Sequence, residues 1–221
     1  DGDIRRGLLR GMQLDSPIDE VIPLSIRAVA EEAVLAPAGL DLEEDTFAPI
    51  LRSVRRRFLW LSINLLTAFV ASAVINIFEE TISKVVALAV LMPIVASMGG
   101  IAGTQTLTLT IRGIALGQIG RANLAYLLNR EFLVAALNGM LLAAIVAVVA
   151  ATAFQDLALG AIIAVAMVVN LLVAGISGSL LPSLLRKINI DPAIAAGVVL
   201  TTITDVTGFF VFLGLATWAY A

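Results

Sequence analysis

The sequence predicts an all-α membrane protein with five transmembrane helices per chain. Of its 221 residues, 60% are hydrophobic and 14% are charged, whereas a soluble domain is about 45–50% apolar and about 25% charged. This composition excludes a soluble globule, which could not bury so much apolar surface. It also excludes a disordered chain, which needs low hydrophobicity. The apolar runs are long and lack period-two alternation, which excludes a β-barrel.

Cysteine and histidine are both absent. Their absence excludes disulfide scaffolds, thiolate or imidazole metal sites and histidine-based catalytic triads. These absences leave only oxygen ligands for a metal ion. We also expect that the protein is not an enzyme. The net charge of −3 says little about partners, and we expect no nucleic-acid partner.

The charges concentrate in the N-terminal part of the chain. Residues 1–57 hold many of them, including Arg55, Arg56 and Arg57, and charged residues become rare from Phe58 onward. This change in composition separates a polar N-terminal segment from a membrane domain over 58–221. The segment has neither the apolar stretch nor the cleavage site of a signal peptide.

Five apolar runs reach the length of about 20 residues that a membrane span needs. They cover residues 58–78, 85–111, 132–154, 157–185 and 193–220. The second run contains Pro93 and several glycines, and the fourth is long enough to be tilted or kinked. The linkers between the runs are short, at residues 79–84, 112–131, 155–156 and 186–191.

Lysine and arginine near the span ends predict the orientation, because these residues are enriched on the cytoplasmic side. They precede the first span and occupy the second and fourth linkers, as Arg52, Arg55, Arg56, Arg57, Arg112, Arg121, Arg130, Arg186 and Lys187. The other two linkers hold only Lys84. We therefore expect a multi-pass protein of the cell (inner or plasma) membrane, with its N-terminus in the cytoplasm and its C-terminus outside.

Asp205 is the strongest single feature, since it lies midway along the fifth span with no lysine or arginine nearby. A carboxylate at mid-bilayer costs about 2.5–3.5 kcal/mol on insertion scales, and such residues usually face a bundle interior or a water-filled path. Helical spacing places small and hydroxyl-bearing residues on the same face, namely Gly197, Thr201, Thr204 and Gly208. This face predicts the wall of a pore or cavity for a hydrated cation. The alternative is a protonated Asp205 that hydrogen-bonds a neighbouring helix.

The second span offers another polar surface, which is formed by Ser97, Thr104, Gln105 and Thr108. Gly99 and Gly103 form a pair that allows close helix contact, and Pro93 can kink the helix. Taken as a unit, the cluster predicts a functional site, and plain helix packing is an equally weighted alternative.

Other polar and small residues of the spans could also line a path, and helix packing is the favoured interpretation for them, namely Asn64, Asn138, Asn170, Ser177 and Gly178. The run from Gly175 to Gly178 resembles a serine nucleophile motif only superficially, because the chain has no histidine. Glu79 and Glu80 lie at the outer end of the first span, where paired carboxylates could raise the local cation concentration. A solvated helix end is the alternative for this pair.

The available oxygen ligands favour Mg²⁺, Ca²⁺ or Mn²⁺ over zinc or copper. Mg²⁺ gives up its water reluctantly and is usually bound through one or two carboxylates with several waters retained. One carboxylate per chain therefore suits a hydrated Mg²⁺ if two chains meet at a shared axis. This reasoning leaves open Mn²⁺, Ca²⁺ and a proton-coupled transporter in which Asp205 is the relay.

Three segments together resemble a known family of membrane proteins. They are residues 92–106 with 111–113, residues 191–193 with 201–209, and Phe78, Glu79 and Glu80 after an arginine-rich entry to the first span. These residues are similar to the signatures of the MgtE magnesium channels and transporters, over roughly residues 43–221. The resemblance implies a homodimer in the lipid bilayer, with five spans per chain and an ion path near the dimer axis. In that family the acid matching Asp205 is the principal Mg²⁺-site residue.

The same resemblance assigns residues 43–57 to a helix that connects a cytoplasmic sensor to the pore, with Glu43, Glu44 and Asp45 at its start. One position departs from the family pattern, because Ile101 stands where the family usually has Asn. Ile101 falls on the helical face of Ser97, Thr104 and Gln105. The change could alter ion selectivity or rate, or it could mark a branch of the family in which the amide is dispensable.

Within residues 1–42, which also include a linker, residues 1–9 continuing to 16–21 resemble the closing part of a CBS (cystathionine-β-synthase-type) domain. In such domains an acid at the position of Asp3 can hold a nucleotide ribose. We interpret residues 1–42 as a truncated regulatory remnant, since about 25 matching residues are too few for an independent core. A nucleotide would bind only through a complete CBS domain.

The favoured function is a Mg²⁺ channel or transporter that passes the hydrated ion through a site centred on Asp205. In this hypothesis the site also includes Thr201, Gly197, Thr204, Gln105, Thr104 and Ser97, with Glu79 and Glu80 at the outer mouth. Two alternatives remain open, namely a divalent cation transporter coupled to Na⁺ or H⁺, and a non-conducting membrane sensor or anchor module.

Overall fold

The computed structural model describes residues 50–119, 123–190 and 192–220, and the regular structure in these ranges is helical. The helices are α4 (Ile50–Ile77), α5 (Glu79–Lys84), α6 (Ala87–Ala115), α7 (Leu124–Phe154), α8 (Leu157–Lys187) and α9 (Pro192–Tyr220). Within these ranges, every helix except α5 is long and apolar enough to cross a membrane. The predicted all-α fold with five spans is therefore confirmed.

Several predictions concern residues outside the described ranges. These are the CBS-like remnant over 1–42 with Asp3, the acids Glu43, Glu44 and Asp45, and Arg121. Of the connecting segment expected at 43–57, residues from Ile50 onward are helical and continue into the first span as α4.

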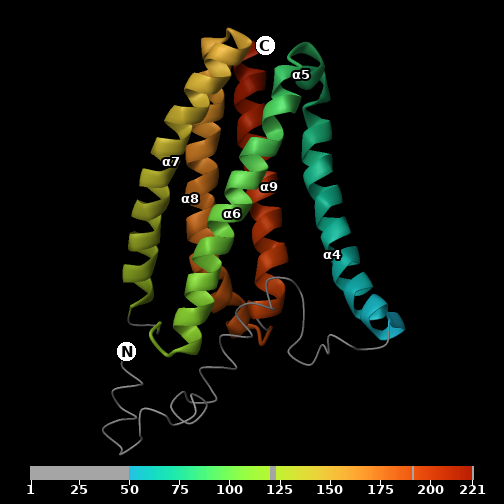
Figure 1. The fold of residues 1–221 in the computed structure, drawn as a ribbon, viewed down its shortest axis with the longest axis vertical. Helices are drawn as coiled ribbons and strands as arrows, with labels where there is room; N and C mark the ends of the chain where they lie inside the picture. The colour runs from blue at the N-terminus through green and yellow to red at the C-terminus, as the bar shows by residue number, and fades with distance from the viewer. Residues whose placement is uncertain (1–49, 120–122, 191, 221) are drawn as a thin grey trace, which may run out of the picture.

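Successive long helices run in opposite directions, so alternate connections gather at the same end (Figure 1). One end holds the start of α4 and the links from α6 to α7 and from α8 to α9, with Arg55, Arg112, Arg186 and Lys187. We call it the basic end. The other end holds α5, the α7–α8 link and the C-terminus of α9.

Helix α8 is the centre of the bundle, because it contacts α6, α7 and α9. Its buried residues run along its whole length, and many are small, including Ala166, Ala174, Gly175 and Gly178. Small side chains let neighbouring helix backbones approach closely in a membrane. Helices α6 and α7 are consecutive in the chain but make little contact, since α8 lies against both.

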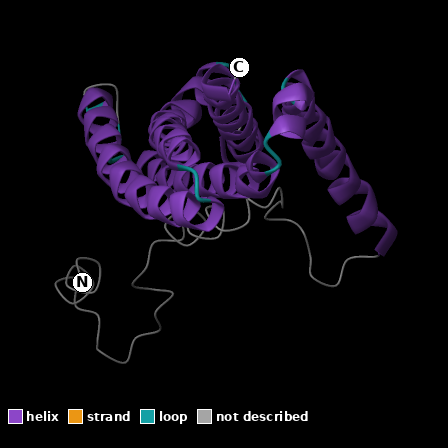
Figure 2. Cartoon of the chain, turned by 90° about the horizontal axis from the view of Figure 1, so that it is seen from above, coloured by secondary structure: helices purple, strands orange, loops and turns teal. Residues whose placement is uncertain are grey.

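Helix α4 is peripheral and packs on α9. Phe78, just after α4, meets Phe210 edge to face with ring centroids 5.8 Å apart, and from this joint α4 diverges toward the basic end (Figure 1). Viewed from above, α4 and α7 lie on opposite flanks of the bundle (Figure 2). Asn64 donates to the carbonyl of Trp60 in its own helix, which satisfies a polar group in an otherwise exposed apolar helix.

The ends of two predicted spans differ from the structure. Helix α7 begins at Leu124 rather than near residue 132, so most of the linker expected at 112–131 is helical. Because Arg130 and Glu131 are charged, the sequence predicts them in the linker. In the structure both residues lie in α7, and their side chains pair with each other. The linker expected at 79–84 forms the short helix α5. Helix α6 also continues without interruption through Pro93.

Candidate functional site

Asp205 lies midway along α9 and is half-buried in the single chain. Its carboxylate makes no hydrogen bond or ion pair with any residue that the structure describes. The described residues also contain no group of three acids that could hold a metal ion. An ion at Asp205 would therefore take few protein ligands from one chain and keep most of its water, as Mg²⁺ does in protein sites.

The face expected around Asp205 is divided in the structure. Gly197, Thr201 and Asp205 are half-buried, whereas Thr204 and Gly208 point into the bundle and are buried. The Thr204 hydroxyl donates to the carbonyls of Leu200 and Thr201 at 3.2 and 3.0 Å. Thr204 and Gly208 lie on the side of α9 that packs against α6 and α8. The expectation that the whole face lines an ion path stays a prediction.

Thr201 remains available beside Asp205. Its hydroxyl donates to the carbonyls of Gly197 and Val198, at 3.2 and 3.0 Å. A hydroxyl that donates its hydrogen still has two acceptor lone pairs. Thr201 can therefore accept a hydrogen bond from a water molecule of a hydrated ion at Asp205.

The polar residues of α6 are not gathered with Asp205 inside one chain. Ser97, Thr104 and Gln105 are exposed, and so is Ile101 on the same face. The opposite face of α6 packs into the bundle through Val95, Gly99, Gly103, Thr106, Leu107 and Thr110. The Thr104 hydroxyl donates to the carbonyl of Gly100 at 2.8 Å, and no hydrogen bond joins these side chains to Asp205 within the described part of the chain.

Asn170 lies where α6, α8 and α9 converge, and its side chain is fully buried. Its Nδ2 donates to the carbonyl of Val95 on α6 at 2.8 Å. A Cβ atom built on Gly99 would overlap the same amide, and one built on Gly208 would lie 2.8 Å from Nδ2. The prediction that Asn170 packs between helices is confirmed, whereas Asn138 is exposed on α7.

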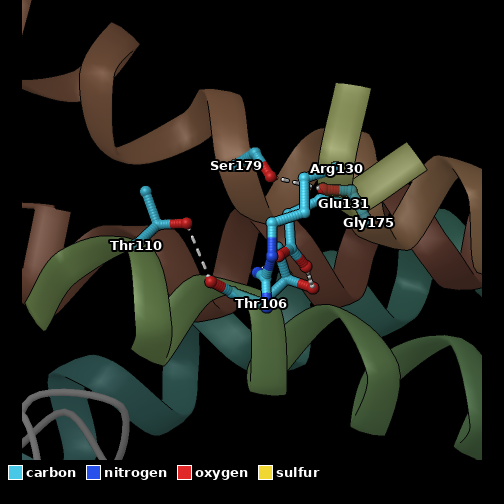
Figure 3. A network of polar contacts seen from close by, with 6 residues as sticks. All are labelled: Thr106, Thr110, Arg130, Glu131, Gly175 and Ser179. Carbon is cyan, nitrogen blue, oxygen red and sulfur yellow. Dashed lines mark hydrogen bonds and ion pairs between the residues drawn. The ribbon is translucent and has the colours of Figure 1, made fainter. Parts of the chain in front are cut away.

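Glu131 is a buried acid that the sequence analysis missed, with 4% of its surface exposed. Its Oε1 accepts from Nη1 of Arg130 at 2.5 Å, and its Oε2 accepts from the hydroxyl of Thr106 on α6 at 3.1 Å (Figure 3). Sequence reasoning placed Glu131 in a linker because Asn129, Arg130 and Glu131 interrupt the apolar residues in the first turns of its helix. An acid next to an arginine at the edge of a long apolar run is the signal that could have identified it.

Two glycines of α8 allow the helices around Glu131 to approach. A Cβ atom on Gly175 would lie 2.9 Å from that of Ala135 on α7, and one on Gly178 would lie 2.8 Å from the carbonyl oxygen of Gly103 on α6. The run from Gly175 to Gly178 is thus a packing motif, which agrees with the interpretation that set aside a nucleophile.

At the end opposite the basic end, the acids Glu79 and Glu80 are exposed in the first turn of α5. Glu80 pairs with Lys84 at 3.2 Å across solvent-exposed side chains, an arrangement worth little in stability. Acids in the first turn of a helix also interact favourably with its dipole. The structure thus accounts for both acids as a solvated helix end, and their role at an outer mouth stays a prediction.

The side chain of Asp156 joins α8 and α9 at the same end. Its Oδ1 accepts from the backbone N–H of Leu159 and caps α8, and its Oδ2 accepts from the Tyr220 hydroxyl at 2.5 Å. The tyrosine hydrogen bond, followed by the bond from Leu159, lowers the pKa of Asp156 below its usual value. A second bond joins the hydroxyls of Thr81 and Thr217 at 2.8 Å, so the end of α9 is held at two points.

The fold and the site define a five-span helical membrane protein, with a carboxylate at the middle of its last span that has no partner among the described residues. The chain belongs to the MgtE family, described as divalent cation transporters, whose family model matches residues 92–215. The matched region includes both polar surfaces, from Pro93 in α6 to Asp205 in α9.

Three magnesium transporters named MgtE are similar to the chain. The protein of Bacillus subtilis (strain 168) is 32% identical over 201 residues, which cover 90% of this chain and 44% of that protein. The protein of Thermus thermophilus is 31% identical over 90% of this chain and 44% of its own length. The protein of Enterococcus faecalis is 31% identical over 81% and 39%. The chain thus spans less than half the length of each of these relatives.

Proposed function

We propose that the chain forms the transmembrane pathway of a Mg²⁺ transporter and that a hydrated Mg²⁺ ion passes through a site centred on Asp205. The observation that carries this proposal is a half-buried carboxylate at mid-membrane with no protein partner among the described residues. An unpaired carboxylate in this position is costly, and acids within spans usually mark ion or proton paths. Membership of a divalent cation transporter family supports the same function.

We propose that two copies of the chain complete the site. Among its described residues, one chain offers a single carboxylate at this depth and leaves Ser97, Thr104 and Gln105 exposed on α6. A second copy across a two-fold axis would bring a second Asp205 to the path and cover exposed polar residues of α6. Two carboxylates with retained water match the usual coordination of Mg²⁺.

Around Asp205, we assign Thr201 and the Gly197 backbone to contacts with the water shell of the ion. Gly197 has no side chain, and Thr201 has a hydroxyl with free lone pairs. Thr104, Gln105 and Ser97 on α6 would extend this polar lining. Thr204 supports the wall from behind, since it is buried. Glu79 and Glu80 are proposed to attract cations to the outer mouth.

Flux of Mg²⁺ into proteoliposomes tests the proposal. The Asp205→Ala and Asp205→Asn variants should lose Mg²⁺ uptake while remaining folded and dimeric. The matched control is Asp156→Asn, which makes the same carboxylate-to-amide change outside the spans and keeps a residue that can cap α8. Unchanged uptake in both Asp205 variants would show that the ion does not pass this carboxylate.

The same assay separates the proposed function from its alternatives. Uptake should follow the Mg²⁺ gradient with no requirement for a Na⁺ or pH gradient, and a strict requirement for either would identify a coupled transporter. A non-conducting sensor or anchor would show no divalent flux under any gradient. Parallel runs with Mn²⁺, Ca²⁺ and Co²⁺ would measure the selectivity.

We further propose that the basic end faces the cytoplasm, which places the C-terminus outside. The chain has no cysteine, so single introduced cysteines can be labelled without background. In intact cells, a membrane-impermeant maleimide should label Ala158→Cys, an exposed position in the first turn of α8. It should not label Gln118→Cys at the α6–α7 link, and the reverse pattern would invert the orientation.

A further inference from the structure

Asn170 is a buried polar residue that a packing role alone does not explain. Its side chain is fully buried at the middle of α8, and its Oδ1 is the buried side-chain atom without a hydrogen-bond partner among the described residues. A leucine has nearly the same shape and would fill this space without an unpaired polar atom. Burying the unpaired amide oxygen costs folding free energy. A buried polar group of this kind calls for an explanation in which its polarity is needed.

The orientation of the amide follows from its one hydrogen bond. Nδ2 donates to the carbonyl of Val95 at 2.8 Å, and a flipped amide would bring two oxygens together at that point. The bond therefore holds the backbone of α6 against α8. Val95 lies two residues beyond Pro93, which lies inside α6. A proline removes one intrahelical hydrogen bond and makes a helix prone to kink at that point.

The same amide also limits the approach of α9. Gly208 of α9 lies against it, and a Cβ atom at that position would be 2.8 Å from Nδ2 and 3.0 Å from Cγ1 of Val95. Gly208 comes one helical turn after Asp205, so the position of Asp205 relative to α6 depends on how closely α9 packs at Asn170. This single side chain touches the family-matched segments of both α6 and α9.

We infer that Asn170 is a positioning residue for the ion pathway: by holding α6 beyond Pro93 and setting the approach of α9 at Gly208, its amide fixes Asp205 relative to the polar face of α6. The inference rests on the proposed function, because it concerns the same site. Asn170 is buried behind the helices that carry the site, so it acts through them.

The first experiment replaces Asn170 by leucine and measures stability and transport together. In proteoliposomes, Asn170→Leu should raise the Mg²⁺ concentration for half-maximal flux by about tenfold, since small displacements of a site have large effects. It should also reduce the preference for Mg²⁺ over Ca²⁺. The thermal midpoint of the purified protein in detergent should stay the same or rise, because the unpaired Oδ1 is removed. A residue used only for packing would give no change in half-saturation.

Met167→Leu is the matched control, since Met167 is also fully buried on α8, one turn earlier. Its side chain packs in a separate cluster with Ala143 and Leu171. The exchange conserves volume, which cores tolerate well, and it should leave the half-saturation concentration and the ion preference unchanged. A shift in this control equal to that of Asn170→Leu would overturn the positioning role.

A second experiment keeps the inference testable if Asn170→Leu does not fold. Gly208→Ala should lower both the thermal midpoint and the flux, because its new methyl group meets the Asn170 amide. Adding Asn170→Ala makes room for that methyl group and should restore much of the thermal midpoint. The half-saturation concentration should remain raised, because the bond to the Val95 carbonyl is still missing. If the thermal midpoint and the half-saturation concentration both returned to the wild-type values, Asn170 would only fill space between the helices, and the inference would be overturned.

The outcomes distinguish this inference from the proposed function. Wild-type protein without Mg²⁺ flux would overturn both. Wild-type flux that depends on Asp205 but has the same half-saturation and ion preference in Asn170→Leu would overturn the positioning role alone.

Discussion

Two acids lie within the spans of this protein, and their surroundings differ in every respect that matters for a charge. Glu131 is 4% exposed and accepts from both Arg130 and Thr106. Asp205 is half-buried and has no partner within the described residues. Glu131 lies near the basic end of α7, whereas Asp205 lies at the middle of α9.

The two acids thus differ in their hydrogen bonding: Glu131 has protein donors on two helices, and Asp205 has none among the described residues. The pair with Arg130 neutralises Glu131, and the arginine side chain is 56% exposed, so its charge can reach water at the membrane surface. Glu131 thus links α7 to α6 where the two helices otherwise make little contact. No described residue compensates the charge of Asp205, and in the proposed function this charge attracts the cation.

The largest expected effect is on transport when the charge of Asp205 is changed. Asp205→Asn should lower Mg²⁺ flux by at least about tenfold, which corresponds to about 1.4 kcal/mol in the barrier. Asp205→Glu keeps the charge and should retain more flux than Asp205→Asn. Thermal unfolding of both variants in detergent should show no loss of stability, because no protein contact of the carboxylate is removed. Equal flux in the two variants would mean that the charge itself is not required.

Removing the Glu131 side chain should lower stability and leave ion affinity unchanged. This is the opposite of the result expected for Asp205, where transport falls and stability is kept. Glu131→Ala should cost about 1–3 kcal/mol of unfolding free energy, the range for removing a buried hydrogen-bonding partner. The exposure of Arg130 keeps the cost below that of a fully buried pair. Denaturation in detergent measures the loss, and the half-saturation for Mg²⁺ in folded protein should be unchanged. A changed half-saturation with intact stability would place Glu131 on the ion path instead.

Thr106→Val sharpens the comparison with a smaller change. The valine removes the hydroxyl that donates to Oε2 of Glu131 at 3.1 Å and leaves the arginine pair in place. We expect a loss of about 1 kcal/mol, as for one net hydrogen bond. Combining Thr106→Val with Glu131→Ala in a double-mutant cycle should give less than the sum of the two losses, because both remove the same bond. Full additivity would show that the bond contributes nothing.

The smallest expected effect concerns Asp156, an acid outside the spans that has partners. Its pKa is lowered in the folded protein, so its contribution to stability is present above its unfolded pKa and is lost as the pH falls through the folded value. Tyr220→Phe removes the hydrogen bond that lowers this pKa most. As the pH falls below about 4, the variant should therefore lose less stability than the wild type does. Thermal midpoints of wild type and variant across this range measure the difference, and identical pH profiles would contradict it.

Much of the fold was predictable because a membrane imposes a length and a composition on every span. The five spans and the alternation of basic linkers follow from runs of apolar residues and from Arg112, Arg186 and their neighbours. The start of α7 was missed because charge in a sequence does not reveal whether it is paired. The sequence around Arg130 and Glu131 is compatible with a loop and with a helix. Only the packing of α6, which brings the Thr106 hydroxyl to Glu131, shows that the acid is buried and hydrogen-bonded.

Only part of the candidate site could be proposed from the sequence, because the sequence does not show which polar groups are covered by other helices. Asp205 is identified by its isolation in an apolar segment, which is a property of the sequence. The division of its face, with Thr204 inside and Thr201 half-exposed, depends on which side of α9 meets α6 and α8. Helical periodicity alone defines a face but does not say what covers it.

The sequence by itself determined the class of protein, because apolar composition, absent cysteine and histidine, and one isolated acid restrict the chain to helices and to oxygen ligands. Only the tertiary structure decided which polar groups are satisfied. It paired Glu131 with its two donors, left the carboxylate of Asp205 without a described partner, and placed the amide of Asn170 between α6 and α9. The physical reason is that a hydrogen bond between distant residues depends on packing, and packing at the glycines of α6, α8 and α9 sets which helices can approach.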